Sequence, residues 1–181
     1  MVRKEVGILL DISRHFWMAE DIYKIITWVK QNGGRYVHLH FSDDVNFAIE
    51  SDVLDQNLAN DFVDKITIEE MDYYASPGAT NYITNSKTQK QYITKAQIKE
   101  LVTFADANDI LLIPEIGFPA HIGGIKNLLM LKYAKLNDLA TYNKIIDQSN
   151  GQLNYRDPVA VQFVKDLLKE TIETFDTPAV I

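Results

Sequence analysis

Residues 36–44, with the sequence Tyr-Val-His-Leu-His-Phe-Ser-Asp-Asp, constrain the fold more than any other stretch of the chain. Apolar and polar residues alternate as far as Ser42, which is the period of a β-strand, and two carboxylates follow directly. A strand that carries histidine, serine and aspartate at its carboxyl end is typical of α/β barrels and open α/β sheets, which keep their chemistry there. This stretch therefore predicts both a strand and a candidate site.

Two other apolar runs, Val6–Ile12 and Ile110–Ile113, resemble strands that are buried on both faces of a parallel sheet. Apolar residues at helical spacing, with cap signals at Thr94 and Asp157, predict helices over residues 19–31, 94–105, 122–136 and 158–175. Shorter predictions are an extended piece at 46–50, helical turns within 52–64, loop or hairpin at 76–81 and 84–91, and a fourth strand opening at 179–181. Residues 137–156 are polar and ambiguous.

This succession predicts an α/β fold, either an open doubly wound sheet or about the first three to four βα units of a (β/α)8 TIM barrel. The first strand is followed by Ser13-Arg-His-Phe16 and not by the glycine-rich turn of a dinucleotide-binding sheet, which favours the barrel. A whole barrel needs about 250 residues. We therefore expect residues 1–181 to be a fragment, the N-terminal half of a barrel, whose unpaired sheet edges would allow a homodimer.

Composition narrows the partners that we expect. The net charge is −7 at pH 7, and no cluster of Lys and Arg offers a track for phosphates, which argues against nucleic acid. No apolar run approaches the roughly 18 residues of a membrane span, and we find no signal peptide. The expected location is the cytoplasm, although a longer secreted parent is compatible with the sequence. The absence of cysteine excludes disulfides and thiolate metal sites.

Polar residues follow all three predicted strands, so a folded sheet would gather them at one end. The candidates are Arg14 after the first strand, His38, His40, Asp43 and Asp44 in and after the second, and Glu115 and His121 after the third. Each also has a purely structural interpretation: Arg14 could pair with Asp11, and the two aspartates could form a solvated turn. The two strand histidines share one face and could be either metal ligands or hydrogen-bonded barrel interior.

Three ordered motifs resemble those of the family 20 glycoside hydrolases, which are β-N-acetylhexosaminidases. They are Leu10-Asp-Ile-Ser-Arg-His-Phe16, His38-Leu-His-Phe-Ser-Asp-Asp44 and Ile113-Pro-Glu-Ile-Gly-Phe-Pro-Ala-His121. The Ile49-Glu-Ser51 continuation and the helix near Tyr92 resemble the dispersin-like branch. The resemblance implies a barrel that removes terminal N-acetylglucosamine or N-acetylgalactosamine from β-linked glycans. It implies the substrate's own acetamido oxygen as nucleophile and no metal or other cofactor.

The resemblance also implies roles for particular residues. Arg14 would bind hydroxyls of the terminal sugar through its fork of donors. Asp43 and His121 would form a hydrogen-bonded relay behind the general-acid glutamate. The remaining residues expected in the mouth of the barrel are His40, Asp44 and Glu115.

Two departures from the family pattern qualify these expectations. Gly117 stands where the family usually has aspartate, and the family's His-x-Gly-Gly-Asp-Glu motif would follow a fourth strand that begins near Ile181. Because that motif carries the general acid, we expect the chain alone to be inactive. Two alternatives are a non-catalytic, sugar-binding or self-associating half-barrel, and a metal-dependent hydrolase that uses His38 and His40 with Glu115 and His121.

Overall fold

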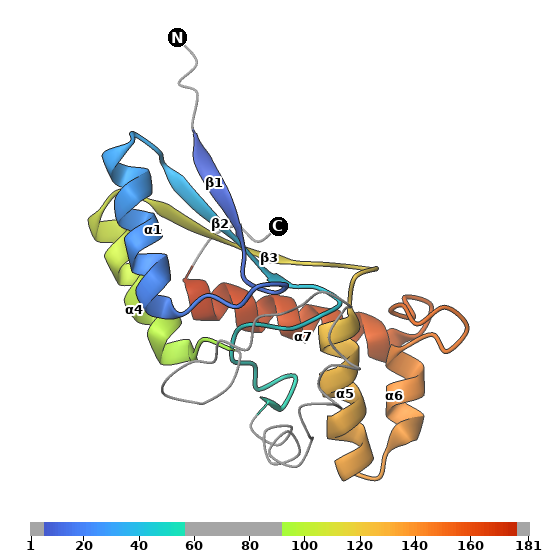
Figure 1. Cartoon of the computed structure of the whole chain (residues 1–181). Helices are drawn as coiled ribbons and strands as arrows, with labels where there is room; N and C mark the ends of the chain where they lie inside the picture. Colours follow the sequence, from blue (N-terminus) through green and yellow to red (C-terminus); the bar gives the residue numbers. More distant parts are fainter. Residues whose placement is uncertain (1–5, 57–91, 177–181) are drawn as a thin grey trace.

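The computed structural model of this protein describes residues 6–56 and 92–176. Strands β1 (Gly7–Asp11), β2 (Tyr36–Ser42) and β3 (Leu111–Ile116) form a parallel sheet in the order β1-β2-β3. The helices are α1 (Ala19–Gln31), α4 (Lys95–Ala107), α5 (Gly123–Lys135), α6 (Leu139–Ile145) and α7 (Pro158–Phe175). Helices α1, α4 and α7 lie on one side of the sheet, and α5 follows the carboxyl end of β3 (Figure 1). The α/β prediction with parallel strands is confirmed.

The predicted helices agree with the structure to within a few residues, and their capping explains where two of them begin. The side chain of Thr94 accepts a hydrogen bond from the backbone N–H of Gln97, and the Gln97 side chain accepts one from the Thr94 N–H, which completes the predicted capping box. Asp157 caps α7 through the N–H of Val159. None of the helices in the described part of the chain has the length and apolar character needed to cross a membrane.

Two details differ from the prediction. Strand β3 continues to Ile116, so Glu115, which was placed in the turn after the strand, lies within the strand. Pro114 lies within this strand, where it is tolerated because β3 is an edge strand of the described sheet. The ambiguous region contains α6, which Asp138 caps through the N–H of Thr141. The predictions for 57–64, 76–81, 84–91 and 179–181 fall outside the described residues.

The two faces of the sheet have different environments. Leu10, Leu39 and Leu112 point toward the helices and are buried in the hydrophobic core. On the opposite face Leu9 is 58% exposed and Leu111 is 45% exposed. Because side chains alternate along a strand, the polar residues Asp11, His40 and Glu115 share this second face. A closed barrel would enclose that face.

A largely buried carboxylate on α7 connects this helix to the segment after β2 and to the start of α4. Glu170 accepts hydrogen bonds from the Ser51 hydroxyl at 2.5 Å and from the Asp52 backbone N–H at 2.7 Å. It also forms a 2.7 Å ion pair with Lys95, and its side chain is only 12% exposed. Removal of Glu170 would therefore take this partner from the Ser51 hydroxyl and the Asp52 N–H, and would leave Lys95 with its exposed ion pair to Asp52.

We predict that Glu170→Ala lowers the free energy of unfolding by about 2–4 kcal/mol, because breaking a buried, hydrogen-bonded ion pair costs far more than breaking an exposed one. The matched control is Glu173→Ala on the same helix, whose carboxylate is 67% exposed and lies 3.8 Å from Lys169. This control should change stability by no more than about 0.5 kcal/mol. Urea denaturation of both variants measures the difference, and equal losses would contradict the role of Glu170.

Candidate active site at the carboxyl end of the sheet

The register of the sheet places three ionisable residues in one row. Asp11 on β1 pairs with His40 on β2, and His40 pairs with Glu115 on β3. All three lie close to the carboxyl ends of their strands. The edge where α/β barrels hold their catalytic residues is therefore occupied here by alternating acidic, imidazole and acidic side chains.

Arg14 extends from the loop after β1 and is held by two carboxylates. Its Nη1 lies 2.8 Å from Asp11 Oδ2, and its Nη2 lies 2.6 Å from Asp43 Oδ2. Asp11 Oδ1 also accepts hydrogen bonds from the backbone N–H groups of Ser13 and Arg14. Burial by itself raises the pKa of Asp11, but these hydrogen bonds and the nearby positive charges leave it below its usual value. Asp11 and Asp43 thus fix the orientation of the guanidinium, while 53% of the Arg14 side chain stays exposed.

Asp43 is the most buried residue of the site, with 4% of its side chain exposed. Its Oδ1 accepts a hydrogen bond from the Asp44 N–H at 2.6 Å. Its Oδ2 is shared between Arg14 and His40, whose Nε2 lies 2.9 Å away. The backbone is fixed as well, because the Asp43 N–H donates to Asn46 and the Asp43 carbonyl accepts from Gly124. Both carboxylate oxygens therefore have partners, as burial of a charge requires.

The two histidines of β2 both approach Glu115. The Glu115 Oε2 lies 2.9 Å from His38 Nε2 and 3.0 Å from His40 Nδ1. These contacts are short enough for ion pairs but poorly aligned for hydrogen bonds. In the described part of the chain, three buried atoms have no well-aligned hydrogen bond, namely His38 Nε2, Glu115 Oε2 and Ser42 Oγ. Burial lowers the pKa of His40, but the contacts with Asp43 and Glu115 and the charges of Glu115 and Asp11 outweigh it and raise the pKa above 6.5.

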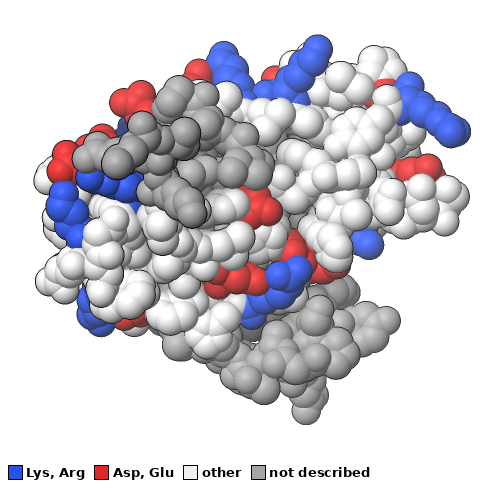
Figure 2. Space-filling view, turned by 90° about the horizontal axis from the view of Figure 1, so that it is seen from above, with Lys and Arg blue, Asp and Glu red and all other residues white. Residues whose placement is uncertain are grey.

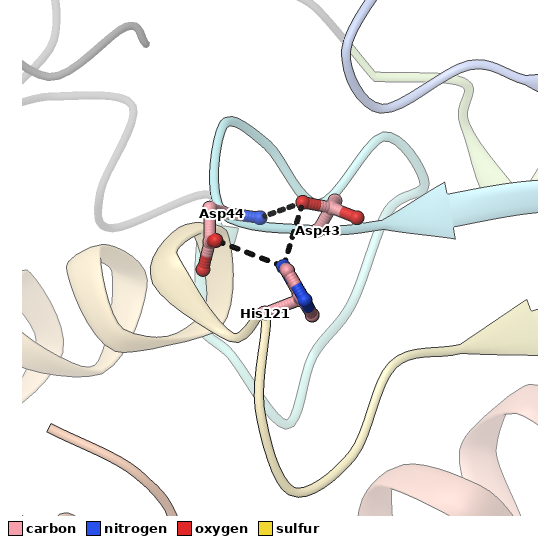
Figure 3. A group of neighbouring side chains, drawn as sticks. All are labelled: Asp43, Asp44 and His121. Atoms are coloured by element: carbon pink, nitrogen blue, oxygen red, sulfur yellow. Dashed lines mark hydrogen bonds and ion pairs between the residues drawn. The ribbon is translucent and has the colours of Figure 1, made fainter. Parts of the chain in front are cut away.

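His121 approaches the pair of aspartates from the loop that precedes α5 (Figure 3). Its Nδ1 lies 3.1 Å from Asp44 Oδ2 and 3.8 Å from Asp43 Oδ1. The sequence interpretation paired His121 with Asp43, whereas the direct hydrogen bond in this structure is to Asp44. The reason is that both oxygens of Asp43 already have closer partners.

The start of α5 is packed directly against the turn that carries the two aspartates. The N–H of Gly123 donates to Asp44 Oδ1 at 3.1 Å. A Cβ atom at Gly123 would collide with the backbone of Asp44, and one at Gly124 with the backbone of Asn46. Glycine is required at both positions because the two backbones touch. Gly117 differs, since a Cβ there would lie near three carbonyl oxygens, of which that of Ser42 is the nearest at 3.3 Å.

One group of side chains has the spacing of metal ligands. Atoms of Asp43, Asp44 and His121 lie within 4.8 Å of one another, whereas His38 and His40 belong to no such group among residues 6–56 and 92–176. The three ligand atoms already face one another or the N–H groups of Asp44 and Gly123, so we assign these side chains as a hydrogen-bonded group. The geometry does not favour a metal site built on His38 and His40.

All seven residues singled out from the sequence lie in one connected group, namely Arg14, His38, His40, Asp43, Asp44, Glu115 and His121. Sequence reasoning considered Asp11 only as a structural partner of Arg14, and it did not include Ser13, whose hydroxyl donates to the Asn46 carbonyl. The signal for Asp11 was available, because it lies near the end of a predicted strand, three residues before Arg14. On the face shown in Figure 2, basic side chains are scattered and several lie next to acidic ones.

A parallel α/β sheet with arginine, carboxylates and histidines at the carboxyl ends of its strands is typical of barrel hydrolase domains. The family model "Glycosyl hydrolase family 20, catalytic domain" matches residues 6–180. The chain belongs to this family.

Known proteins and solved structures agree with this assignment. The chain is 27% identical to the chitooligosaccharidolytic beta-N-acetylglucosaminidase of Ostrinia furnacalis over 94% of its length, and 25% identical to the human beta-hexosaminidase subunit beta over 93%. It spans a quarter of the length of each of these relatives. The crystal structure of Dispersin B is similar with a TM-score of 0.72 and 29% identity, covering 96% of this chain and 45% of Dispersin B. A family 20 exo-β-N-acetylglucosaminidase from Vibrio harveyi has the same fold, with a TM-score of 0.69 at 21% identity over 97% of this chain and 26% of that one.

Proposed function

We propose that this chain is the sugar-binding N-terminal half of a retaining β-N-acetylhexosaminidase domain, and that it does not hydrolyse glycans by itself. The substrate class is glycans with a terminal β-linked N-acetylglucosamine or N-acetylgalactosamine. The observation that carries the proposal is Arg14, a half-exposed guanidinium that Asp11 and Asp43 orient at the carboxyl end of a family 20 sheet.

The described residues suit binding better than proton donation. Arginine presents planar, permanently charged donors, which match pairs of sugar hydroxyls. Asp43 contacts both Arg14 and His40, so it is suited to orienting a cation. The Asp44–His121 pair could transmit a change of charge to a general acid. The general acid is a different residue, because it must itself donate a proton to the leaving group. In the proposed reaction, the acetamido group of the substrate attacks and a glutamate outside the described residues donates that proton.

The length of the match supports the proposal that the chain is inactive alone. The chain covers 45% of Dispersin B and about a quarter of the longer relatives. A catalytic barrel closes its pocket with loops from all eight βα units, and three strands are described here. Loss of a general acid alone typically costs about 10²- to 10⁴-fold in rate.

A second candidate function is self-association, and the exposed face of the sheet favours it. Leu9 and Leu111 lie on β1 and β3, which are the two edge strands of the described sheet. An open edge offers backbone hydrogen-bond donors and acceptors to another strand, and exposed leucines on that face add apolar area. Two copies related by a two-fold axis could cover this surface.

We predict that Arg14→Ala weakens binding of N-acetylglucosamine by about 10- to 100-fold, because hydrogen bonds to a charged group are worth about 1.5–3 kcal/mol. Arg35→Ala is the matched control, since Arg35 is also exposed but precedes the amino end of β2. Titration followed by NMR chemical shifts measures both affinities. Equal binding by wild type and Arg14→Ala would contradict the proposed role of Arg14.

We predict that the purified chain releases no chromophore from a chromogenic β-N-acetylglucosaminide above the buffer rate. The reason is that the general acid and the second half of the pocket are not supplied by the described residues. The assay needs Arg14→Ala as a control, because a contaminating glycosidase would be unaffected by that change. Turnover that disappears in Arg14→Ala would show that the chain is an active enzyme.

We predict that self-association, if it uses the open face, is reversed by Leu9→Lys together with Leu111→Lys. Charges on an exposed sheet face oppose strand pairing. Sedimentation equilibrium over a hundredfold range of protein concentration measures the dimer fraction. A wild-type chain that stays monomeric throughout that range, or a dimer that the two lysines leave intact, would contradict this second candidate.

A further inference from the structure

We propose that His40 is a positioning residue, whose charged ring between Asp43 and Glu115 fixes the Asp43 carboxylate that orients Arg14 toward the sugar. This inference rests on the proposed function, in which Arg14 is the sugar-binding group. His40 itself is 13% exposed at its side chain and lies behind Arg14, so it acts through Asp43 and not by contact with the sugar.

The protonation state follows from the two contacts of the ring. Nε2 lies 2.9 Å from Asp43 Oδ2, and Nδ1 lies 3.0 Å from Glu115 Oε2. A neutral imidazole carries one N–H and one lone pair, so one of the two carboxylates would face a lone pair at close range. In the imidazolium form both nitrogens are donors. The geometry therefore favours the charged ring, in agreement with the raised pKa of His40.

A single oxygen atom connects this ring to Arg14. Asp43 Oδ2 lies 2.6 Å from Arg14 Nη2 and 2.9 Å from His40 Nε2. The other oxygen of Asp43 is held by the Asp44 N–H. With His40 in place, the carboxylate is fixed at both oxygens and Arg14 has one orientation to follow. Without His40, Asp43 Oδ2 would still contact Arg14 but would lose its contact with β2.

The charges around the His40 ring also favour its protonated form. Asp11 on β1, Glu115 on β3 and Asp43 after β2 face His40, and Arg14 is the cation that contacts two of them. The outer neighbours of this group are His38, which contacts Glu115, and His121 and Asp44, which adjoin Asp43. If His40 were neutral, the carboxylates of Asp11, Glu115 and Asp43 would be balanced by one positive charge, that of Arg14. The proton on His40 supplies the second positive charge.

A pH dependence follows with a definite sign. The pKa of His40 is raised in the folded chain, so the ring is charged below that value and loses its charge as the pH rises through it. N-acetylglucosamine has no group that titrates in this range. Sugar affinity should therefore be highest at mildly acidic pH and decrease above the folded pKa of His40. The change belongs to the protein and not to the ligand.

The test compares wild type, His40→Gln and His38→Gln by NMR titration with N-acetylglucosamine at pH 5.5 and at pH 8.5. His38→Gln is the matched variant, because His38 is on the same face of β2 and contacts Glu115 but has no contact with Asp43 among those described. We expect wild-type affinity to fall about fivefold or more between the two pH values. His40→Gln should bind weakly at both, without the pH dependence, and His38→Gln should keep the wild-type profile.

The outcomes separate this inference from the proposed function. If Arg14→Ala loses binding but His40→Gln binds with the wild-type affinity and pH profile, the positioning role is overturned and the proposed function survives. If wild type and Arg14→Ala bind equally, the proposed function fails and the inference falls with it. Should His40→Gln fail to fold, the ring ¹⁵N resonances of His40 in wild type decide. A titration midpoint that coincides with the midpoint of the affinity change supports the inference, and a clear mismatch overturns it.

Discussion

The described site depends on the burial of the Asp43 carboxylate. A charge with 4% of its side chain exposed is tolerated only when every oxygen has a partner, and Asp43 obtains its partners from three separate places. Arg14 comes from the loop after β1, His40 comes from β2, and the Asp44 N–H comes from the turn itself. The same requirement that stabilises the buried charge therefore also brings the loop after β1 to the end of β2. Positioning of Arg14 and stability of the turn are two consequences of one interaction.

The sheet explains why the polar residues lie where they do. Its helix-covered face is apolar, whereas the opposite face carries leucines toward one end and the row of Asp11, His40 and Glu115 toward the other. In a closed barrel this face is an interior, in which the polar row lies at the carboxyl end and Leu9, His38 and Ile113 form the next layer. The exposure of Leu9 and Leu111 in the described chain is what such an interior shows when other strands do not cover it.

Much of this arrangement could be predicted from the sequence, because the spacing of apolar and polar residues shows which side chains share one face of a strand or helix. The alternation in residues 36–42 placed His38 and His40 on one face, and the capping residues Thr94 and Asp157 marked two helix starts. Pairings across the fold could not be read in the same way. That His121 hydrogen bonds to Asp44 and not to Asp43 depends on which oxygens are already occupied, and that in turn depends on Arg14 arriving from a distant loop. The Ser51–Glu170 hydrogen bond has no local signal at all.

The same reasoning accounts for Gly117, where the family usually has aspartate. A side chain at this position would start 3.3 Å from the Ser42 carbonyl oxygen, so a carboxylate would enter beside an acceptor atom. The site already holds Asp11, Asp43, Asp44 and Glu115, while Arg14 and the proton on His40 supply its positive charge. His121 also has its carboxylate partner in Asp44. A fifth acidic side chain added to the row and its turn would increase the repulsion among these carboxylates, so glycine at 117 suits the charge balance of this chain.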